Sequence, residues 1–92
     1  MNAMKYTPTF KRALELCKKR LEESPTFPPL RAIEKQLEYL IELDEGRRAD
    51  FERLQEINLG LLAAREFEPH DMEFANQMYE VMDAVDNLKF GR

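Results

Sequence analysis

The sequence predicts an all-α fold, a compact bundle of four antiparallel helices in a single domain spanning residues 1–92. Three observations support this prediction. Apolar residues recur in four segments at the three- and four-residue spacing of amphipathic helices, proline or glycine stands where these segments should end, and no segment alternates as a strand does. A chain of 92 residues has room for one modest core. We therefore expect one helical domain, with residues 1–6 flexible.

The first two predicted helices cover residues 8–23 and 29–44. Thr7 suits the N-cap of the first helix, and Pro8 suits its first position, where a backbone N–H has no helical partner. Gly46 suits a left-handed C-cap for the second helix. The residues expected to face the core are Phe10, Ala13, Leu14, Cys17 and Leu21 in the first helix, and Leu30, Ile33, Leu37, Leu40 and Ile41 in the second.

The third and fourth predicted helices cover residues 49–66 and 70–89. Gly60 in the middle of the third costs on the order of 1 kcal/mol relative to alanine. Asp71 is a good N-cap for the fourth. Short connections make consecutive helices antiparallel neighbours. The residues expected to face the core are Phe51, Leu54, Ile57, Leu61 and Leu62 in the third helix, and Phe74, Ala75, Met78, Tyr79, Met82 and Val85 in the fourth.

Charge is distributed unevenly along the chain. Residues 1–20 hold six Lys or Arg and one acidic residue, whereas residues 66–86 hold seven acidic residues and no Lys or Arg. Either the first and last helices attract each other within the monomer, or the asymmetry steers a partner protein. The pI near 5 argues against a nucleic-acid partner for the basic first helix.

Residues that could support catalysis are scarce. His70, the single histidine, precedes the fourth helix, and Cys17, the single cysteine, lies on an apolar helix face. A lone histidine at a helix entry is more often a solvated or capping residue than a catalytic base, and a thiol on an apolar helix face is usually an inert small hydrophobe. No phosphate-binding or metal-binding motif is present. The sequence therefore predicts no enzyme activity, no cofactor and no metal. One cysteine and no apolar run of roughly 18 residues predict a cytoplasmic protein without a membrane partner.

The outer face of the second helix carries residues that folding alone does not explain. A helical wheel places Tyr39 nearly opposite the core, where it would anchor a protein interface or pack on a neighbouring loop. Glu34, Glu38 and Glu42 stand four residues apart, a spacing that costs a few tenths of a kcal/mol per pair through repulsion. Such an acidic column either serves solubility alone or suits docking against a cationic surface.

Three sequence blocks carry a resemblance to a known family. They are residues 32–40 (AIEKQLEYL), 53–60 (RLQEINLG) and 63–68 (AAREFE). Their order and spacing resemble bacterial type VI secretion immunity proteins, and more narrowly the family that neutralises NAD(P)-glycohydrolase effector toxins. The resemblance runs from about residue 12 to residue 79, but loop 44–50 and the segment after residue 79 depart from the pattern.

The resemblance implies a cytosolic antidote that binds a cognate effector toxin and blocks access of substrate to the toxin's active site. The matched block assigns Glu34, Lys35, Gln36 and Tyr39 to the partner interface. The acidic column adds Glu38 and Glu42 to that interface.

A second hypothesis is a helical adaptor or self-associating domain without a toxin partner. It would bind through methionines of the fourth helix, Met72, Met78 and Met82, because methionine repacks easily against varied partners. A homodimer of the free protein is left open.

Overall fold

Helices form where the apolar spacing predicts them, with one interruption. The computed structural model describes residues 5–90, in which no strand occurs. Its elements are α1 (Thr7–Glu23), α2 (Pro28–Asp44), the 3₁₀ helix η1 (Phe51–Glu56), α3 (Leu59–Glu66) and α4 (Met72–Phe90). The all-α prediction is confirmed. The expected flexible segment, residues 1–6, lies mostly outside the described residues.

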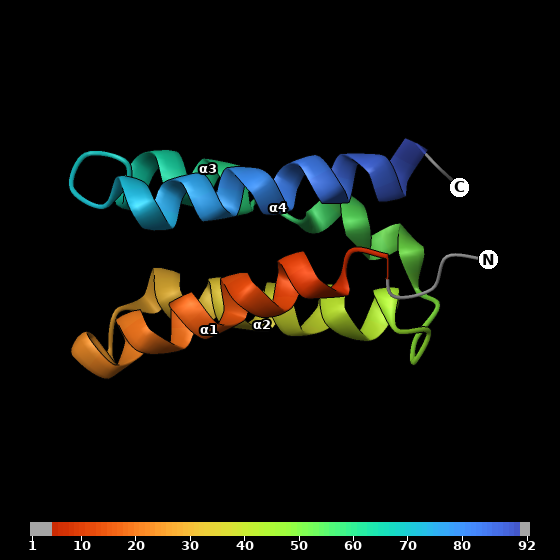
Figure 1. Cartoon of the computed structure of the whole chain (residues 1–92), viewed down its shortest axis with the longest axis horizontal. Coiled ribbons are helices and arrows are strands. Elements are labelled where there is room, and N and C mark those ends of the chain that lie inside the picture. The colour runs from red at the N-terminus through yellow and green to blue at the C-terminus, as the bar shows by residue number, and fades with distance from the viewer. Residues whose placement is uncertain (1–4, 91–92) are drawn as a thin grey trace.

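The helices form two pairs that pack against each other. Figure 1 shows α1 beside α2 in one half of the molecule and α3 beside α4 in the other, with consecutive helices reversing direction along the long axis. α1 also contacts α4, and α2 also contacts α3. The radius of gyration is 12.7 Å, close to the roughly 12 Å expected for a compact chain of this length. One core therefore lies between the two pairs.

The core contains most of the residues predicted for it. In α1 and α2 all ten predicted residues are buried except Leu14, which is half-buried. In α4, Tyr79 and Met82 are half-buried, and the other four predicted residues are buried together with Val81 and Ala84. The apolar stripes of these three helices thus fix which faces pack inward.

The start of α1 differs from the predicted cap. Thr7 is the first helical residue and Tyr6 holds the N-cap position. The Thr7 hydroxyl donates to Oδ2 of Asp44 at 2.7 Å, and the backbone N–H of Tyr6 donates to the same oxygen at 2.8 Å. The buried Asp44 carboxylate therefore ties the last turn of α2 to the first turn of α1.

The end of α2 is a glycine cap, as predicted. Gly46 has φ of 81°, a left-handed conformation that glycine adopts without strain. The N–H of Gly46 donates to the carbonyl of Leu43, and the N–H of Arg47 donates to the carbonyl of Glu42. These two bonds form a Schellman motif, which reverses the chain so that the next segment runs back along α2.

The prediction of one continuous helix over residues 49–66 is wrong. η1 ends at Glu56, and Ile57 is extended, with φ of −71° and ψ of 123°. α3 then begins after Asn58, which occupies its N-cap position. Asparagine favours caps over helix interiors because its side chain competes for backbone hydrogen bonds. Gly60 consequently lies in the first turn of α3 and not in mid-helix.

The interruption changes which side chains of this segment face the core. Leu61, predicted to face inward, is 54% exposed, whereas Leu59 and Ala63 are buried. Of the other predicted residues, Leu54 is buried and Phe51, Ile57 and Leu62 are half-buried. Residues 57 and 58 are not helical, and the helix that follows them starts in a different phase. A single helical period therefore cannot describe both parts of the segment.

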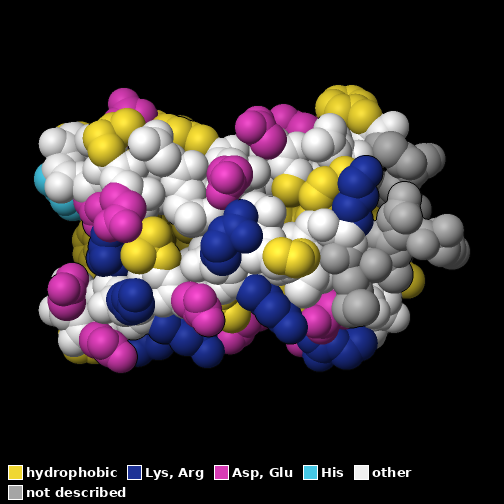
Figure 2. Space-filling view, in the orientation of Figure 1, with side chains coloured by type: hydrophobic (Ala, Val, Ile, Leu, Met, Phe, Trp, Pro, Cys, Tyr) yellow, Lys and Arg dark blue, Asp and Glu magenta, His cyan; other side chains and the backbone are white. Residues whose placement is uncertain are grey.

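Ion pairs link α1 to α4. Arg20 donates through Nε to Asp71 at 2.7 Å and through Nη2 to Glu73 at 3.0 Å, and Arg12 lies 3.7 Å from Glu80. Figure 2 shows basic and acidic side chains side by side along this seam. Asp71 also accepts from the N–H of Phe74, which confirms it as the N-cap of α4. The charge asymmetry of the sequence thus serves contacts within the monomer.

Candidate protein-binding face

Tyr39 does not point away from the protein. Its side chain is only 7% exposed, so the prediction of an exposed anchor is wrong and the loop-packing alternative is correct. The hydroxyl donates to the carbonyl of Asp50 at 2.8 Å. The guanidinium groups of Arg48 and Arg53 lie 4.8 Å and 5.5 Å from the ring centroid. Burial raises the pKa of Tyr39 above its ordinary value.

The side chain of Gln36 also makes contacts within the protein. Its Nε2 donates to Oδ1 of Asn58 at 2.7 Å, and its Oε1 accepts the backbone N–H of Asn58 at 3.0 Å. These two bonds hold the start of α3 against α2. Gln36 therefore stabilises the interruption between η1 and α3 and is not free to bind a partner in this arrangement.

Arg48 joins the loop after α2 to the helix itself. Its guanidinium donates to Oε1 of Glu42 at 3.0 Å and to both carboxylate oxygens of Asp50 at 2.8 Å. The hydrogen bond from Arg48 holds the pKa of Asp50 below its ordinary value. We call Gln36 and Tyr39, together with segment 45–58, the loop side of α2.

The other predicted interface residues remain accessible. Lys35 and Glu38 are exposed, and their side chains make no hydrogen bond or ion pair with any described residue. Glu34 is half-buried and pairs with Arg31 at 3.2 Å on the same helix. The structure thus divides the six predicted residues into three pairs. Gln36 and Tyr39 hold the fold, Glu34 and Glu42 pair with arginines at half-buried positions, and Lys35 and Glu38 are exposed and have no ion pair with any described residue.

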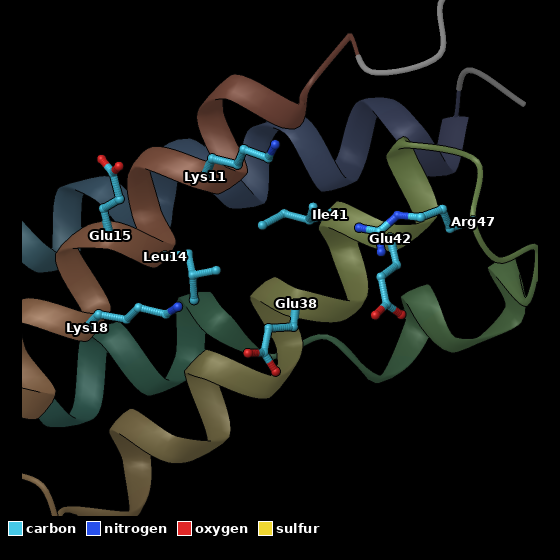
Figure 3. A pocket seen from close by; sticks show the side chains of 8 residues that line it. All are labelled: Lys11, Leu14, Glu15, Lys18, Glu38, Ile41, Glu42 and Arg47. Carbon is cyan, nitrogen blue, oxygen red and sulfur yellow. The ribbon is translucent and has the colours of Figure 1, made fainter.

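A groove borders Glu38 and Glu42 on the side of α2 that faces α1. Its volume is about 540 Å³, and Figure 3 shows side chains of both helices around it. Leu14 and Ile41 supply apolar surface at its base. The lining residues are Lys11, Leu14, Glu15, Lys18, Glu38, Ile41, Glu42 and Arg47. We call this the α1–α2 groove.

Sequence reasoning did not assign the α1 residues of this groove. The available signal was the spacing of Lys11, Glu15 and Lys18, which repeats a charge every three or four residues and places all three on one helix face. That spacing marks a face but does not show which other helix the face adjoins. The partner helix became known only from the packing of α1 on α2.

The two residues with reactive side chains are both held by the fold. Cys17 is buried, and its Sγ donates to the carbonyl of Leu30 at 3.4 Å. Burial raises the pKa of Cys17 to about 12, so the thiolate is scarce at neutral pH. Nε2 of His70 donates to the carbonyl of Glu66 at 2.8 Å, since a carbonyl can only accept. Among residues 5–90, no three potential ligands are grouped to hold a metal ion.

The methionines of α4 do not form a common surface. Met78 is buried, Met82 is half-buried against the core, and Met72 is 47% exposed. Met78 and Met82 therefore pack against the core, as residues at helical spacing usually do. Within the described chain, no helix has the length and apolar character needed to cross a membrane.

The fold is that of a small all-α protein, and its second helix, α2, presents charged residues that are accessible. A family model described as Tsi6 matches residues 5–87, nearly the whole chain, and the chain belongs to this family. The family is of the type VI secretion immunity kind, in agreement with the resemblance in the sequence blocks. No curated protein and no solved structure matches the chain.

Proposed function

We propose that this protein is an immunity protein that binds a cognate interbacterial effector toxin in the cytoplasm and occludes the toxin's active site. The toxin we propose is one that degrades NAD(P). Membership of the Tsi6 family over residues 5–87 is the observation that carries the proposal. The accessible residues of α2, namely Glu34, Lys35, Glu38 and Glu42, are the proposed contacts.

The charge of this face supports the proposed partner. An enzyme that binds a dinucleotide phosphate needs cationic groups in its pocket, and an acidic helix face complements such a pocket. Glu34 and Glu42 are paired with Arg31 and Arg48, but Glu38 between them has no ion pair with any described residue. The unpaired carboxylate of Glu38 supports a binding role for this face.

Inhibition would require no chemistry from the immunity protein. A rigid helix face seated over the pocket excludes the dinucleotide, and charge complementarity raises the rate of association. The Schellman motif and the Arg48 contacts hold the end of α2 and its loop in one geometry before binding. Such preorganisation lowers the entropy cost of forming the complex.

The test is co-expression with the toxin domain encoded beside this gene. We expect this protein to restore growth and cellular NAD(P) and to form a stoichiometric complex on gel filtration. An immunity protein from an unrelated toxin pair is the control and should not rescue. Absence of both rescue and complex would overturn the proposal.

The NAD(P) part of the proposal has a separate readout. The purified toxin domain should consume NAD(P) in vitro, and an equimolar amount of this protein should stop the consumption. The protein alone should leave NAD(P) unchanged. Rescue of growth with no loss of NAD(P) in unprotected cells would retain the immunity role and reject this chemistry.

A further inference from the structure

The α1–α2 groove contains two opposite charges that do not pair with each other. Lys18 of α1 and Glu38 of α2 both line it, and neither forms a hydrogen bond or an ion pair with any described residue. Figure 3 shows Lys18 reaching over the groove near Leu14, with Glu38 on the facing helix. The groove thus presents an accessible cation and an accessible anion beside apolar surface.

This arrangement differs from that of most neighbouring charges. Several surrounding charged side chains pair within the protein: Lys11 and Arg47 with Glu45, Arg31 with Glu34, and Arg48 with Glu42 and Asp50. Glu15, which also lines the groove, has no ion pair with any described residue. Lys18 and Glu38 therefore remain available to groups from outside the molecule.

We propose that the α1–α2 groove is the primary docking site for the effector and that it takes an amphipathic segment of that protein. The segment places an apolar side chain on Leu14 and Ile41, a Lys or Arg against Glu38, and an Asp or Glu against Lys18. This proposal rests on the proposed function and adds α1 to a binding face otherwise assigned to α2 alone.

The geometry of the groove supports an inserted segment. The two helices supply charges on both walls, and Leu14 and Ile41 supply apolar contact between them. A peptide segment in a groove of this kind is held by its apolar side chain, while flanking charges set its register and direction. Lys18 on one wall and Glu38 on the other favour one orientation of the segment over the reverse.

Charge reversal tests the proposal. The assay is isothermal titration calorimetry of the purified protein against the toxin domain encoded beside its gene. Glu38→Lys and Lys18→Glu should each raise Kd at least about tenfold, because each replaces an attraction with a repulsion at the interface. Both positions are exposed helix sites, and unchanged thermal unfolding would show that the fold is intact.

The double variant Glu38→Lys/Lys18→Glu separates local pairing from net charge. It has the same net charge as the wild type, so steering by net charge alone predicts wild-type affinity. Specific pairing predicts a larger loss than either single variant. Asp83→Lys on α4 and Arg65→Glu on α3 are matched controls, because both residues are exposed and neither has an ion pair with any of residues 5–90. They should change Kd less than about twofold.

The outcomes distinguish this inference from the proposed function. If wild-type protein binds the toxin domain and the groove variants bind equally well, the groove proposal is overturned and the immunity role stands. If wild-type protein does not bind, both are overturned. A groove that instead takes a second copy of this chain would show a concentration-dependent dimer in sedimentation that Glu38→Lys abolishes, and this result would also overturn the proposal.

Discussion

The two flanks of α2 use their polar residues in opposite ways. On the loop side, Gln36 and Tyr39 are bonded to Asn58 and Asp50, and both contacts reach a segment that follows α2. On the flank facing α1, Glu38 has no partner among the described residues, although charges of both signs stand nearby. One short sequence block therefore contains residues that hold the fold and residues available for binding.

This difference shows that not every residue of a sequence block that resembles a family contributes to binding. The block at residues 32–40 matches the immunity-protein pattern, yet its tyrosine and glutamine close the loop side of α2. We expect the same tyrosine and glutamine in any related chain whose third helix is interrupted in this way and must be held against the second helix. The comparison predicts that mutations on the loop side reduce stability, while those on the other flank reduce binding.

The largest effect is expected for Tyr39→Ala. It removes a buried ring that contacts two guanidinium groups and leaves the carbonyl of Asp50 without its donor. The free energy of unfolding, measured by urea denaturation, should fall by about 3 kcal/mol. Tyr39→Phe keeps the ring and should cost about 1 kcal/mol. A fully stable Tyr39→Ala protein would contradict the structural role of this residue.

Gln36→Ala should have a smaller effect on stability. It deletes two hydrogen bonds to Asn58 at a partly exposed site, which are together worth about 1 kcal/mol. Lys35→Ala is the matched control. The side chain of the adjacent Lys35 makes no hydrogen bond or ion pair within the described part of the chain, so the loss of stability should stay within about 0.5 kcal/mol. Equal losses for the two variants, measured by urea denaturation, would show that the Asn58 contact contributes nothing.

Acid should weaken the loop side through Asp50. Arg48 lowers the pKa of Asp50 in the folded state, so the unfolded state binds more protons between the two pKa values. The stabilising contribution is complete above the ordinary pKa near 4 and disappears as pH falls through the lowered value. Asp50→Asn should flatten the dependence of Tm on pH between about 5 and 2, as measured by circular dichroism. An unchanged pH profile would reject this contact as a source of stability.

The smallest effect on stability is expected for Glu38→Gln. Removing this charge relieves repulsion from Glu34 and Glu42, so the free energy of unfolding should stay equal or rise by a few tenths of a kcal/mol. Affinity for the toxin domain should nevertheless fall. Calorimetry for binding and urea denaturation for stability provide the two measurements. A loss of stability with unchanged affinity would contradict the assignment of binding to the flank of α2 that faces α1.

Local signals explain the parts of the fold that could be predicted. Asp71 caps α4 and Gly46 caps α2 because each acts within a few residues of its own position. The apolar stripes of α1, α2 and α4 identified the faces that pack inward. The break before Asn58 was not predicted, because it is stabilised by Gln36, which lies 22 positions earlier in the chain.

The candidate site was predictable to a lesser degree. Periodicity correctly placed Glu38 on an accessible face, but the same wheel placed Tyr39 there as well. Segment 45–58 returns along α2 and buries the tyrosine ring. A helical wheel measures the angle of a residue from the core of its own helix, so it cannot show what a later segment will cover.

The sequence by itself determined four helical regions, two of their caps, the inward faces of three helices and the charge that links α1 to α4. These features depend on backbone propensity and on apolar residues at fixed spacing, which act over one or two turns. Only the tertiary structure decided that Tyr39 is buried, that residues 49–66 form two helices and that Lys18 and Glu38 border one groove. These features depend on contacts between segments distant in sequence, whose relative positions are fixed when the helices pack.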